Sequence, residues 1–551
     1  MTQTVSDRIV EVLRSHGVET VFGIPGVHNL ALFEALDRSE IRAVVVRHEA
    51  TAAYAADACG RLTGRPGVCI TTSGPGAANT VAAMGEAQAS RAPLLHLTTT
   101  VARRHLGGEV SRGVLHEHPE QQAIFRPVTK LARHVDEPDE VAAVVDHALA
   151  FAASAPAAPA YVEIPTDVLG QPAAGHAVGG SGQPAASPDR AALRELAARL
   201  TRAERPLIWV GSGAAREAGA IVALAERLGA PVVLTHSAKR AWGEGSHPLV
   251  VRHPPHEPPV ERLCAAADTV LVLGSDLDGM MTQEFRLPLA DVLRIDVDSR
   301  RLELPYPSDL PVLGDAALVL RGLLSLLGAR ERGWGGEAVA AADAEAGAAL
   351  AQEPEAAAGL AFVDALDTAL GERDAVVVCD MAIAAYWTGA YLPLRPTRRI
   401  VYPMGWGTLG FALPAAVGAA ACAAGRTVAI CGDGGALFAI GELATIAQER
   451  LPVTVVVQSD GGYGMLRYDE ELTYERAFAV DLRPPDFPAL AAAFGFAVER
   501  VELDGGGLAE ALARGLDADG PALVEVVGTL TPPRTTSARW PLKGGLHGAR
   551  R

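Results

Sequence analysis

Positive charge is scarce in this chain of 551 residues. Lysine and arginine number 48 against 65 aspartates and glutamates, so the formal net charge is −17 at neutral pH. This balance argues against nucleic acid and anionic membrane surfaces as main partners. The six cysteines are scattered and form no CxxC pair, so we expect reduced thiols in the core of a cytoplasmic protein.

The chain also lacks the patterns of a leader or membrane segment. Residues 4–17 alternate charged and apolar side chains at helical spacing and contain no signal-peptide core. The most apolar stretch, residues 411–424, includes Pro414 and many small side chains. That composition predicts a buried helix rather than a membrane span.

Alternating strands and helices with glycine-rich turns run along most of the sequence. This order is typical of α/β domains with parallel sheets, and the length is too great for one core. Stretches rich in Gly, Ala, Pro and Ser (170–188) and in Ala and Glu (329–358) read as linkers. We therefore predict three doubly wound parallel-sheet domains, at residues 1–170, 190–328 and 359–535.

One stretch in the last domain carries the strongest chemical signal. Gly432-Asp433-Gly434-Gly435 follows an apolar strand, residues 436–450 have helical spacing, and a second strand leads to Ser459-Asp460-Gly461-Gly462-Tyr463-Gly464. A strand, helix and strand return both aspartates to one edge of a parallel sheet, where cofactors dock. Glycine amides there can approach a phosphate, and Asp433 offers a hard oxygen ligand for Mg²⁺. A Gly-Asp-Gly triplet alone also fits an ordinary turn between a strand and a helix.

The whole segment resembles the thiamin-diphosphate-binding signature. Further motifs in the same order extend the resemblance over nearly the whole chain, to the thiamin-diphosphate-dependent decarboxylase and acetolactate synthase superfamily. These motifs are Arg47-His48-Glu49, Ser73-Gly-Pro-Gly76 with Asn79, Arg126-Pro-Val-Thr-Lys130, and Gly405-Trp-Gly-Thr-Leu-Gly410 with Pro414. The resemblance implies a pyrimidine-binding, a central and a diphosphate-binding domain.

The resemblance also assigns roles to residues. Metal ligands would be Asp433, Asp460 and the carbonyl of Gly462. Glu49, at the end of an early strand, would face N1′ of the aminopyrimidine, which needs a carboxyl of raised pKa in a dry pocket. The cofactor would contact Pro25, Glu49, Gly407, Leu409, Asp433, Gly434, Gly435, Asp460, Gly462 and Tyr463.

Residues on the substrate side resemble one branch of the superfamily. Gly23-Ile-Pro-Gly-Val-His28 and Gly113-Val-Leu-His-Glu117 are most similar to 5-guanidino-2-oxopentanoate decarboxylase-like enzymes. His28, His116 and Glu117 would then face the reacting centre and move protons, with His118 and Glu120 in the same wall. A surface-loop position is an equally good interpretation for each of these residues.

Three departures from the family pattern bear on function. Ser459-Asp460 replaces the usual Asn-Asn, and Asp380-Met381-Ala382 lacks the Gly-Gln-His-Gln of acetolactate synthases. His116-Glu117 replaces their Phe-Gln. Val251-Arg-His-Pro-Pro-His256 stands where flavin-binding relatives have a glycine-rich turn, and Gly211-Ser-Gly213 lacks the third glycine of a dinucleotide fingerprint. We therefore expect no FAD.

Three functions stay open. The first is a thiamin-diphosphate- and Mg²⁺-dependent decarboxylase that converts a 2-oxo acid to an aldehyde and CO₂. The second is a carboligase of acetolactate-synthase type, and the third is a catalytically silent cofactor-binding subunit. The resemblance implies a homodimer or homotetramer with active sites between subunits. The side chain of the 2-oxo acid is not defined by these motifs.

Overall fold

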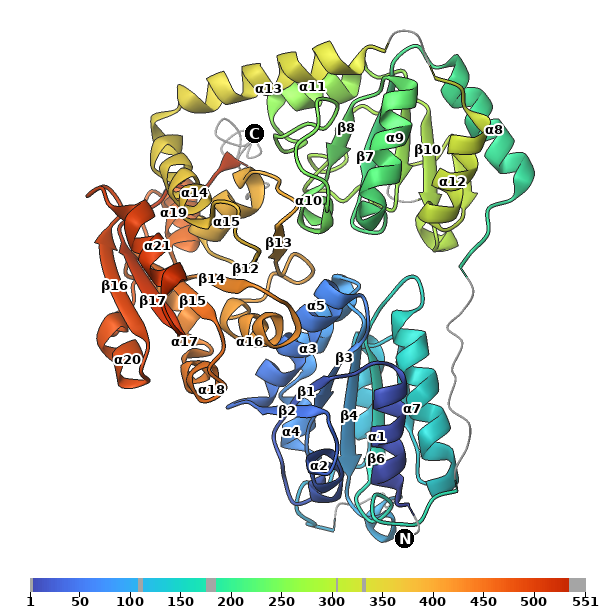
Figure 1. Cartoon of the computed structure of the whole chain (residues 1–551), viewed down its shortest axis with the longest axis vertical. Coiled ribbons are helices and arrows are strands. Elements are labelled where there is room, and N and C mark those ends of the chain that lie inside the picture. Colours follow the sequence, from blue (N-terminus) through green and yellow to red (C-terminus); the bar gives the residue numbers. More distant parts are fainter. Residues whose placement is uncertain (1–2, 108–111, 175–184, 304–305, 330–332, 535–551) are drawn as a thin grey trace.

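Three parallel sheets, each in its own α/β domain, make up the molecule (Figure 1). The computed structural model describes residues 3–107, 112–174, 185–303, 306–329 and 333–534. The strands are short, nearly continuous apolar runs, such as Thr269–Leu273 and Ala375–Cys379, all of whose residues are buried. Such runs are typical of parallel strands covered on both faces by helices. The predicted fold class is confirmed.

The first domain has a six-stranded sheet in the order β2-β1-β3-β4-β6-β5. Its strands are β1 (Thr20–Gly23), β2 (Arg42–Val45), β3 (Gly67–Ile70), β4 (Leu94–Thr100), β5 (Leu131–His134) and β6 (Ala160–Pro165). Its helices are α1 (Val5–Ser15), α2 (Leu30–Asp37), α3 (Glu49–Thr63), α4 (Pro75–Ala78), α5 (Val81–Ala89), α6 (Gln121–Phe125) and α7 (Pro138–Ala153), with 3-10 turns η1 (Arg103–His105) and η2 (Arg126–Val128).

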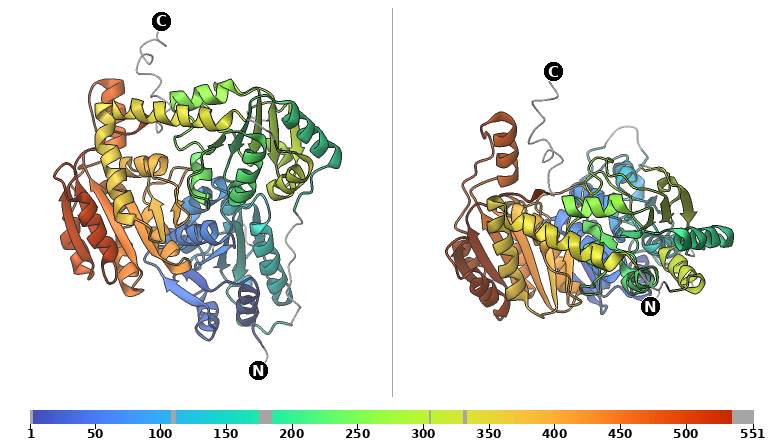
Figure 2. Two further views of the ribbon diagram at one scale, coloured as in Figure 1. Left: turned by 45° about the horizontal axis from the view of Figure 1, so that its top comes forward. Right: turned by 90° about the horizontal axis from the view of Figure 1, so that it is seen from above.

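The central domain has a five-stranded sheet in the order β11-β10-β9-β7-β8. Its strands are β7 (Pro206–Val210), β8 (Val232–Leu234), β9 (Thr269–Leu273), β10 (Val292–Asp296) and β11 (Leu310–Leu313). Its helices are α8 (Arg190–Arg202), α9 (Ala218–Leu228), α10 (His236–Ala241), α11 (Pro258–Ala266) and α12 (Ala316–Leu326), with η3 (Ala215–Glu217) and η4 (Ser299–Arg301). Part of the predicted linker 329–358 is the helix α13 (Gly335–Ala351), which packs on α11 and leads across to the third domain (Figures 1 and 2).

The third domain has a six-stranded sheet in the order β13-β12-β14-β15-β17-β16. Its strands are β12 (Ala375–Cys379), β13 (Arg398–Val401), β14 (Arg426–Gly432), β15 (Val453–Ser459), β16 (Ala497–Glu502) and β17 (Ala522–Val527). Its helices are α14 (Ala357–Leu370), α15 (Ile383–Tyr391), α16 (Ala412–Cys422), α17 (Asp433–Leu437), α18 (Leu443–Gln448), α19 (Gly464–Tyr474), α20 (Phe487–Ala493) and α21 (Leu508–Asp517), with η5 (Pro354–Ala356) and η6 (Ile440–Glu442).

The first and third sheets share one topology. Counted within each domain, both run in the strand order 2-1-3-4-6-5. The strand order reverses between the first and third strands of each sheet, although all the strands stay parallel, and ligands bind outside the carboxyl ends of strands at such a switch point. In the third domain this point lies between β12 and β14, next to the Gly432–Gly435 turn.

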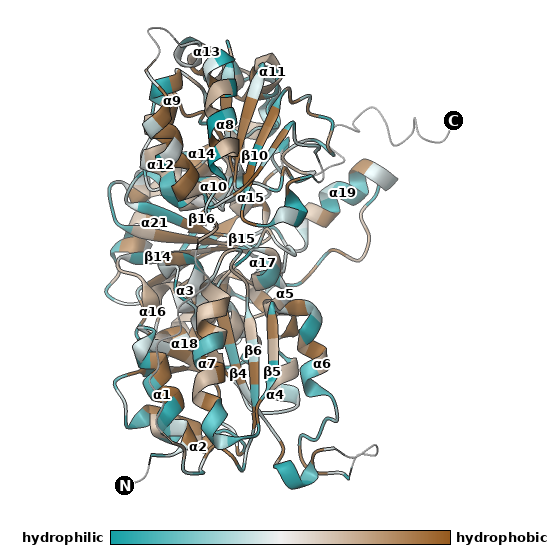
Figure 3. Ribbon diagram, turned by 90° about the vertical axis from the view of Figure 1, so that its right-hand side faces the viewer, coloured by the Kyte–Doolittle hydropathy of each residue, from teal (hydrophilic) through white to brown (hydrophobic). Residues whose placement is uncertain are grey.

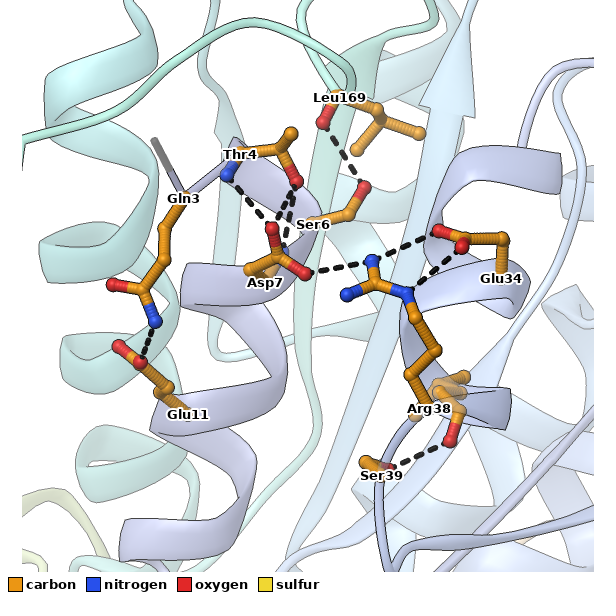
Figure 4. A network of polar contacts seen from close by, with 10 residues as sticks. Gln3, Thr4, Ser6, Asp7, Glu11, Glu34, Arg38, Ser39 and Leu169 are labelled. Atoms are coloured by element: carbon orange, nitrogen blue, oxygen red, sulfur yellow. Dashed lines mark hydrogen bonds and ion pairs between the residues drawn. The ribbon is translucent and has the colours of Figure 1, made fainter. Parts of the chain in front are cut away.

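The N-terminus of the first helix, α1, is capped by a capping box (Figure 4). The Thr4 hydroxyl accepts a hydrogen bond from the Asp7 amide at 3.2 Å, and the Asp7 carboxylate accepts one from the Thr4 amide at 2.8 Å. Arg38, just after α2, then donates to Asp7 and to Glu34 at 2.8 Å each. The N-terminal end of the predicted amphipathic segment is thus capped, which favours helix from its first residue.

The first and third domains pack through two helices of small residues, α3 and α16, which contribute to one hydrophobic core. A Cβ placed on Gly418 would lie 2.0 Å from the carbonyl oxygen of Ala55, so the helices approach at backbone contact. Cys59 and Cys422 are joined here by a disulfide, with Cα atoms 5.7 Å apart. The expectation that all six cysteines are reduced is therefore wrong for this pair, because the helix packing brings together two residues that are distant in sequence; Cys69, Cys264, Cys379 and Cys431 are free and buried.

One expectation about a helix turned out differently. The segment 436–450, predicted as one helix, is split into α17, η6 and α18, and the buried Glu442 carboxylate at the break accepts the Arg47 amide at 3.0 Å. Helix α19 stands away from the body of the domain and buries none of its residues (Figure 3). Within the described ranges no helix has the length and apolar character to cross a membrane, and residues 412–422 form a buried helix as predicted.

Candidate active site

Three aspartates gather at the carboxyl edge of the third sheet. Asp380 follows β12, Asp433 follows β14 and Asp460 follows β15, and these three strands are neighbours in the sheet. The Gly461 amide donates to the Asp433 carboxylate at 2.8 Å, which joins the two turns. The prediction that Asp433 and Asp460 return to one edge is confirmed by this contact.

Asp433 and Asp460 form a pair of buried carboxylates. Asp433 is 1% exposed and the Asp460 side chain 4% exposed. Burial raises the pKa of both groups, and the Asp433 charge raises that of Asp460 further, while amide donors and Arg467 oppose the rise. Arg467 also donates to the carbonyls of Asp460 and Gly461 at 3.3 Å and pairs with Asp481 at 3.0 Å.

The carboxylate oxygens at this edge are ligands that suit a hard cation such as Mg²⁺. Two carboxylates that oppose each other's ionisation gain most from a divalent ion between them. Among the described residues no group of three or more His, Cys, Asp or Glu side chains is placed to hold a metal. Mg²⁺ bound at Asp433 and Asp460 would thus need backbone or ligand oxygens, such as the predicted Gly462 carbonyl, to complete its shell.

The glycines of the motif hold neighbouring groups close. A Cβ on Gly434 would lie 2.8 Å from the Tyr463 ring, and one on Gly462 would lie 2.2 Å from the Val480 carbonyl. The Gly434 amide donates to Asp433 at 2.7 Å, so it already has a partner within the turn. Gly435 lies beside Asp380, whose Oδ1 would be 3.3 Å from an added Cβ.

Asp380 anchors the loop that carries Gly407 and Leu409, a role that sequence reasoning missed. Its carboxylate accepts from the amides of Gly410 and Ala412, each at 3.0 Å. Asp380 is 1% exposed, and burial raises its pKa to about 6 against the pull of these amides. The signal for it was its position directly after an apolar strand.

Two apolar side chains of this loop are partly exposed. Gly407 has φ of 69° and Gly410 φ of 76°, the left-handed region that favours glycine. Leu409 is 37% exposed and Trp406 55% exposed. The role of Leu409 beside the cofactor stays a prediction.

Glu49 lies in the first domain, as the first residue of α3 rather than at the end of a strand. It is half-buried, and the Asn79 side chain donates to its Oε2 at 2.9 Å. A Cβ on Gly76 would lie 3.4 Å from its Oε1, so glycine keeps this side of the carboxyl open. The dry pocket expected around Glu49 is not formed by this chain alone.

The histidines of the first domain meet above the Ser73–Gly74 turn. His28 and His116 rings lie edge to face with centroids 5.3 Å apart, and His28 Nδ1 is 2.5 Å from Ser73 Oγ. Burial and then the His116 charge lower the pKa of His28. Pro25 is exposed in the turn before His28.

Glu117 is turned toward its own loop. Its carboxylate accepts from the amides of Arg112 at 2.8 Å and Val114 at 3.1 Å. His116 beside it has φ of 64°, and a Cβ added to Gly74 would lie 2.9 Å from the His116 Cβ. The catalytic role of Glu117 stays a prediction, and His118 and Glu120 are exposed.

A buried polar network behind the turn was also missed. Gln121 accepts the Gly74 amide at 2.7 Å and donates to the Thr99 carbonyl, Tyr161 and Glu163 at 3.0, 2.9 and 3.2 Å. Gln121 and Glu163 are each 4% exposed. Gln121 and its neighbour Gln122 lie in a short helical stretch, where a glutamine gives no sequence signal for such a contact.

Sequence comparison matches all three domains to one family. Residues 3–124 match the N-terminal TPP-binding domain of thiamine pyrophosphate enzymes, 193–323 the central domain and 380–526 the C-terminal TPP-binding domain. The chain belongs to the thiamine pyrophosphate enzyme family. Thiamine pyrophosphate is thiamin diphosphate, so the predicted organic cofactor is the family's own, and the site at the carboxyl edges lies within the matched regions.

Relatives of this family match almost end to end. A Pseudomonas aeruginosa protein named "Probable 2-ketoarginine decarboxylase AruI" is 35% identical over 535 residues, which cover 95% of this chain and 94% of the relative. The "Acetolactate synthase" of Mycobacterium bovis is 32% identical, covering 89% and 82%. The large subunit of acetolactate synthase isozyme 1 of Escherichia coli is 28% identical, covering 95% and 93%.

In the central domain of this thiamine pyrophosphate enzyme, the two segments compared above with nucleotide-binding motifs are packed against neighbouring residues. A Cβ on Gly211 would lie 2.2 Å from the Gly274 carbonyl, so the Gly211–Gly213 turn is packed against the next strand turn. The 251–256 segment is held by Asp343, which accepts from the Arg252 amide at 3.1 Å and contacts His253 at 2.8 Å. The absence of FAD stays a prediction.

Proposed function

We propose that this protein is a thiamin-diphosphate- and Mg²⁺-dependent decarboxylase that converts a 2-oxo acid to an aldehyde and CO₂. The observation that carries the proposal is the 35% identity, along nearly the whole of both chains, to a protein named as a 2-ketoarginine decarboxylase. His116 and Glu117, which replace the Phe-Gln of acetolactate synthases, support the same choice. A 2-oxo acid with a cationic side chain is the first substrate to test.

Residues of the third domain hold the cofactor in this proposal. Asp433 and Asp460 would ligate Mg²⁺ together with the Gly462 carbonyl, and the metal would supply positive charge for binding the diphosphate. Gly434, Gly435 and Tyr463 line the turn around it, with Gly407 and Leu409 at the aminopyrimidine. Thiamin diphosphate, when bound, supplies the nucleophilic carbon and the electron sink for loss of CO₂.

Glu49 holds the proton that activates the cofactor. Asn79 fixes one carboxylate oxygen, so the other is presented in a defined direction. A carboxyl in this position donates to the ring nitrogen N1′ once its surroundings are dry. The lining that excludes water would come from a second copy of the chain.

His28 and His116 carry protons on the substrate side. The lowered pKa of His28 keeps its imidazole neutral near pH 7, so it can accept or donate a proton there. Ser73 fixes the ring through Nδ1. Protonation of the carbon left after CO₂ loss is assigned to this pair, with Glu117 holding the loop.

A homodimer is the proposed minimum unit, and a homotetramer is compatible with it. Large apolar side chains are exposed beside both halves of the site: Val27 (63%) and Leu115 (62%) in the first domain, Trp406 (55%) and Phe438 (60%) in the third. Such exposure next to functional residues supports burial against a second copy. The cytoplasmic location expected from composition stays a prediction.

A carboligase of acetolactate-synthase type is the second candidate, favoured by relatives with that name at 28% to 32% identity. Such an enzyme would join the acyl group derived from the 2-oxo acid to a second carbonyl compound. The third candidate, a silent cofactor-binding subunit, would not need Glu49 and its Asn79 contact.

A product assay separates the three. The protein, loaded with thiamin diphosphate and Mg²⁺, is incubated with 2-ketoarginine, a neutral isostere and pyruvate, and aldehyde, acyloin and CO₂ are quantified. Aldehyde with one equivalent of CO₂ is expected, fastest with 2-ketoarginine. Acyloin alone would contradict the decarboxylase assignment, and no turnover of any substrate would favour the silent subunit.

Glu49→Gln provides the matched test of mechanism. It should lower turnover by at least about 100-fold, the scale of general acid catalysis, without unfolding the protein. Glu34→Gln, at an exposed glutamate on α2, is the control and should leave turnover unchanged. Near-normal rates for Glu49→Gln would refute its assignment.

A further inference from the structure

A buried glutamate of the first domain holds the cofactor loop of the third domain. Glu86 lies on α5 and is 0% exposed. Its Oε1 accepts the Gly405 amide at 3.1 Å and its Oε2 accepts the Trp406 amide at 2.8 Å. These amides directly precede Gly407 in the loop that carries Leu409.

The charge of Glu86 is partly offset by Arg61, which the buried Asp57 shares. Arg61, near the end of α3, lies 3.3 Å from Glu86 and donates to Asp57 at 2.6 Å. The same guanidinium donates to the Tyr402 carbonyl at 2.9 Å. Burial alone would raise the pKa of Glu86, but Arg61, the Ser90 hydroxyl and the two loop amides hold it below its usual value.

The loop is seated against α5 by shape as well as by charge. A Cβ on Gly85 would lie 2.4 Å from the Trp406 ring, so only glycine leaves room for that ring. A Cβ on Gly405 would lie 2.8 Å from Ala89 Cβ and from Ser90 Oγ. Segment 402–406 therefore packs closely against α5 in the first domain of its own chain.

The other end of the loop is fixed within the third domain. Asp380 accepts the amides of Gly410 and Ala412. Residues 407–409, which lie between the two anchors, have no such carboxylate contact. The position of the Gly407 carbonyl and the Leu409 side chain is thus set jointly by Asp380 and Glu86.

We propose that Glu86 is a positioning residue for the cofactor: from the first domain it fixes, through the amides of Gly405 and Trp406, the loop that presents Gly407 and Leu409. This inference rests on the proposed function for the role of the loop, while the contact itself does not depend on it. Sites built on rigid supports hold reacting groups to about 0.5 Å, and a misplacement of about 1 Å can cost 100-fold in rate.

The test is Glu86→Gln, which keeps the size of the side chain. One acceptor oxygen becomes an NH₂ group that faces a backbone N–H, so one loop amide loses its partner. In the cofactor-free protein we expect hydrogen exchange of the Gly405 and Trp406 amides to speed up by about tenfold or more. The dissociation constant for thiamin diphosphate, measured by calorimetry at saturating Mg²⁺, should rise by about tenfold as well.

Asp343→Asn is the matched control. Asp343 is a carboxylate 5% exposed that accepts a backbone amide and contacts Arg252 and His253, but it lies on α13, which packs against the central domain. It should lower stability without changing exchange at residues 402–410 or cofactor affinity. Equal exchange at Gly405 and Trp406 in both variants, or unchanged cofactor affinity in Glu86→Gln, would overturn the inference.

Ser90→Ala keeps the test decisive if Glu86→Gln does not fold. The Ser90 hydroxyl donates to Glu86 Oε1 at 2.6 Å, and its removal leaves the ion pair intact. Faster exchange of the Gly405 amide by about two- to fivefold is expected, and no change would overturn the inference. If wild-type protein bound no thiamin diphosphate, the proposed function would fail, while exchange would still decide whether Glu86 holds the loop.

Discussion

Substitution of Gly418 by alanine tests how closely the first and third domains are joined. An added Cβ would lie 2.0 Å from the Ala55 carbonyl oxygen, whereas ordinary contacts begin near 3.4 Å. The two helices must separate by about 1.4 Å, the difference of these distances, or the backbone must deform. Overpacking of this kind costs about 1–3 kcal/mol.

Gly347→Ala is the matched control, because Gly347 lies inside helix α13 and an added Cβ meets only His253, at 3.9 Å. There alanine should stabilise by about 1 kcal/mol through helix propensity. The two variants should therefore differ in Tm, measured at one scan rate, by on the order of 5 °C or more.

The domain junction also bears on activity. Helix α16 follows the Gly405–Gly410 loop and α3 begins at Glu49, so Gly418→Ala should also lower turnover, and Gly347→Ala should not. Equal Tm values for the two alanine variants would refute the backbone contact between α3 and α16.

Asp460→Ala should raise the Mg²⁺ concentration for half-maximal activity by at least about tenfold, since it removes a proposed ligand; an unchanged Mg²⁺ titration would exclude that role. Asp380→Asn should flatten the pH dependence of stability. The folded pKa of about 6 lies above the unfolded 3.8, so this carboxyl stabilises the fold fully below pH 3.8 and loses that contribution as pH rises through about 6. The change in the free energy of unfolding is on the order of 3 kcal/mol. It is measured by urea unfolding from pH 4 to 7, and the same pH dependence of that free energy in wild type and variant would contradict the prediction. His116→Gln removes one of the two causes that lower the His28 pKa, so the acid limb of the kcat/KM profile should move to higher pH; an unmoved limb would separate His28 from catalysis.

Much of the architecture follows from local pattern. Apolar runs bounded by glycine turns predicted the strands, and their alternation with helices predicted parallel sheets. Asp433 and Asp460 could be brought together from sequence because parallel strands return to the same edge. That step needed only the order of elements, and the Gly461–Asp433 contact agrees with it.

Contacts between distant helices could not be predicted in this way. Cys59 and Cys422 meet because Gly418 and the surrounding alanines let α3 and α16 approach, and neither cysteine carries a local signal of that approach. Glu86 reads as an ordinary glutamate on a helix, yet it binds amides more than 300 positions further along the chain. Asp380 was visible only as an acid after a strand.

Helix α3 carries a functional group near each of its ends. Glu49 is its first residue, and Arg61, twelve positions later and about 18 Å along the axis, reaches the Tyr402 carbonyl. In the dimer proposed above, each active centre combines the first domain of one copy with the third domain of the other. Glu49 then acts on the cofactor held by the third domain of the second copy. Arg61 supports the cofactor loop in the third domain of its own copy, which belongs to the other centre. Mixed assemblies should reveal this arrangement. A copy inactivated at Glu49 and a copy inactivated at Asp433 would together restore one working centre, whereas a copy with α3 broken would impair both centres and complement neither defect.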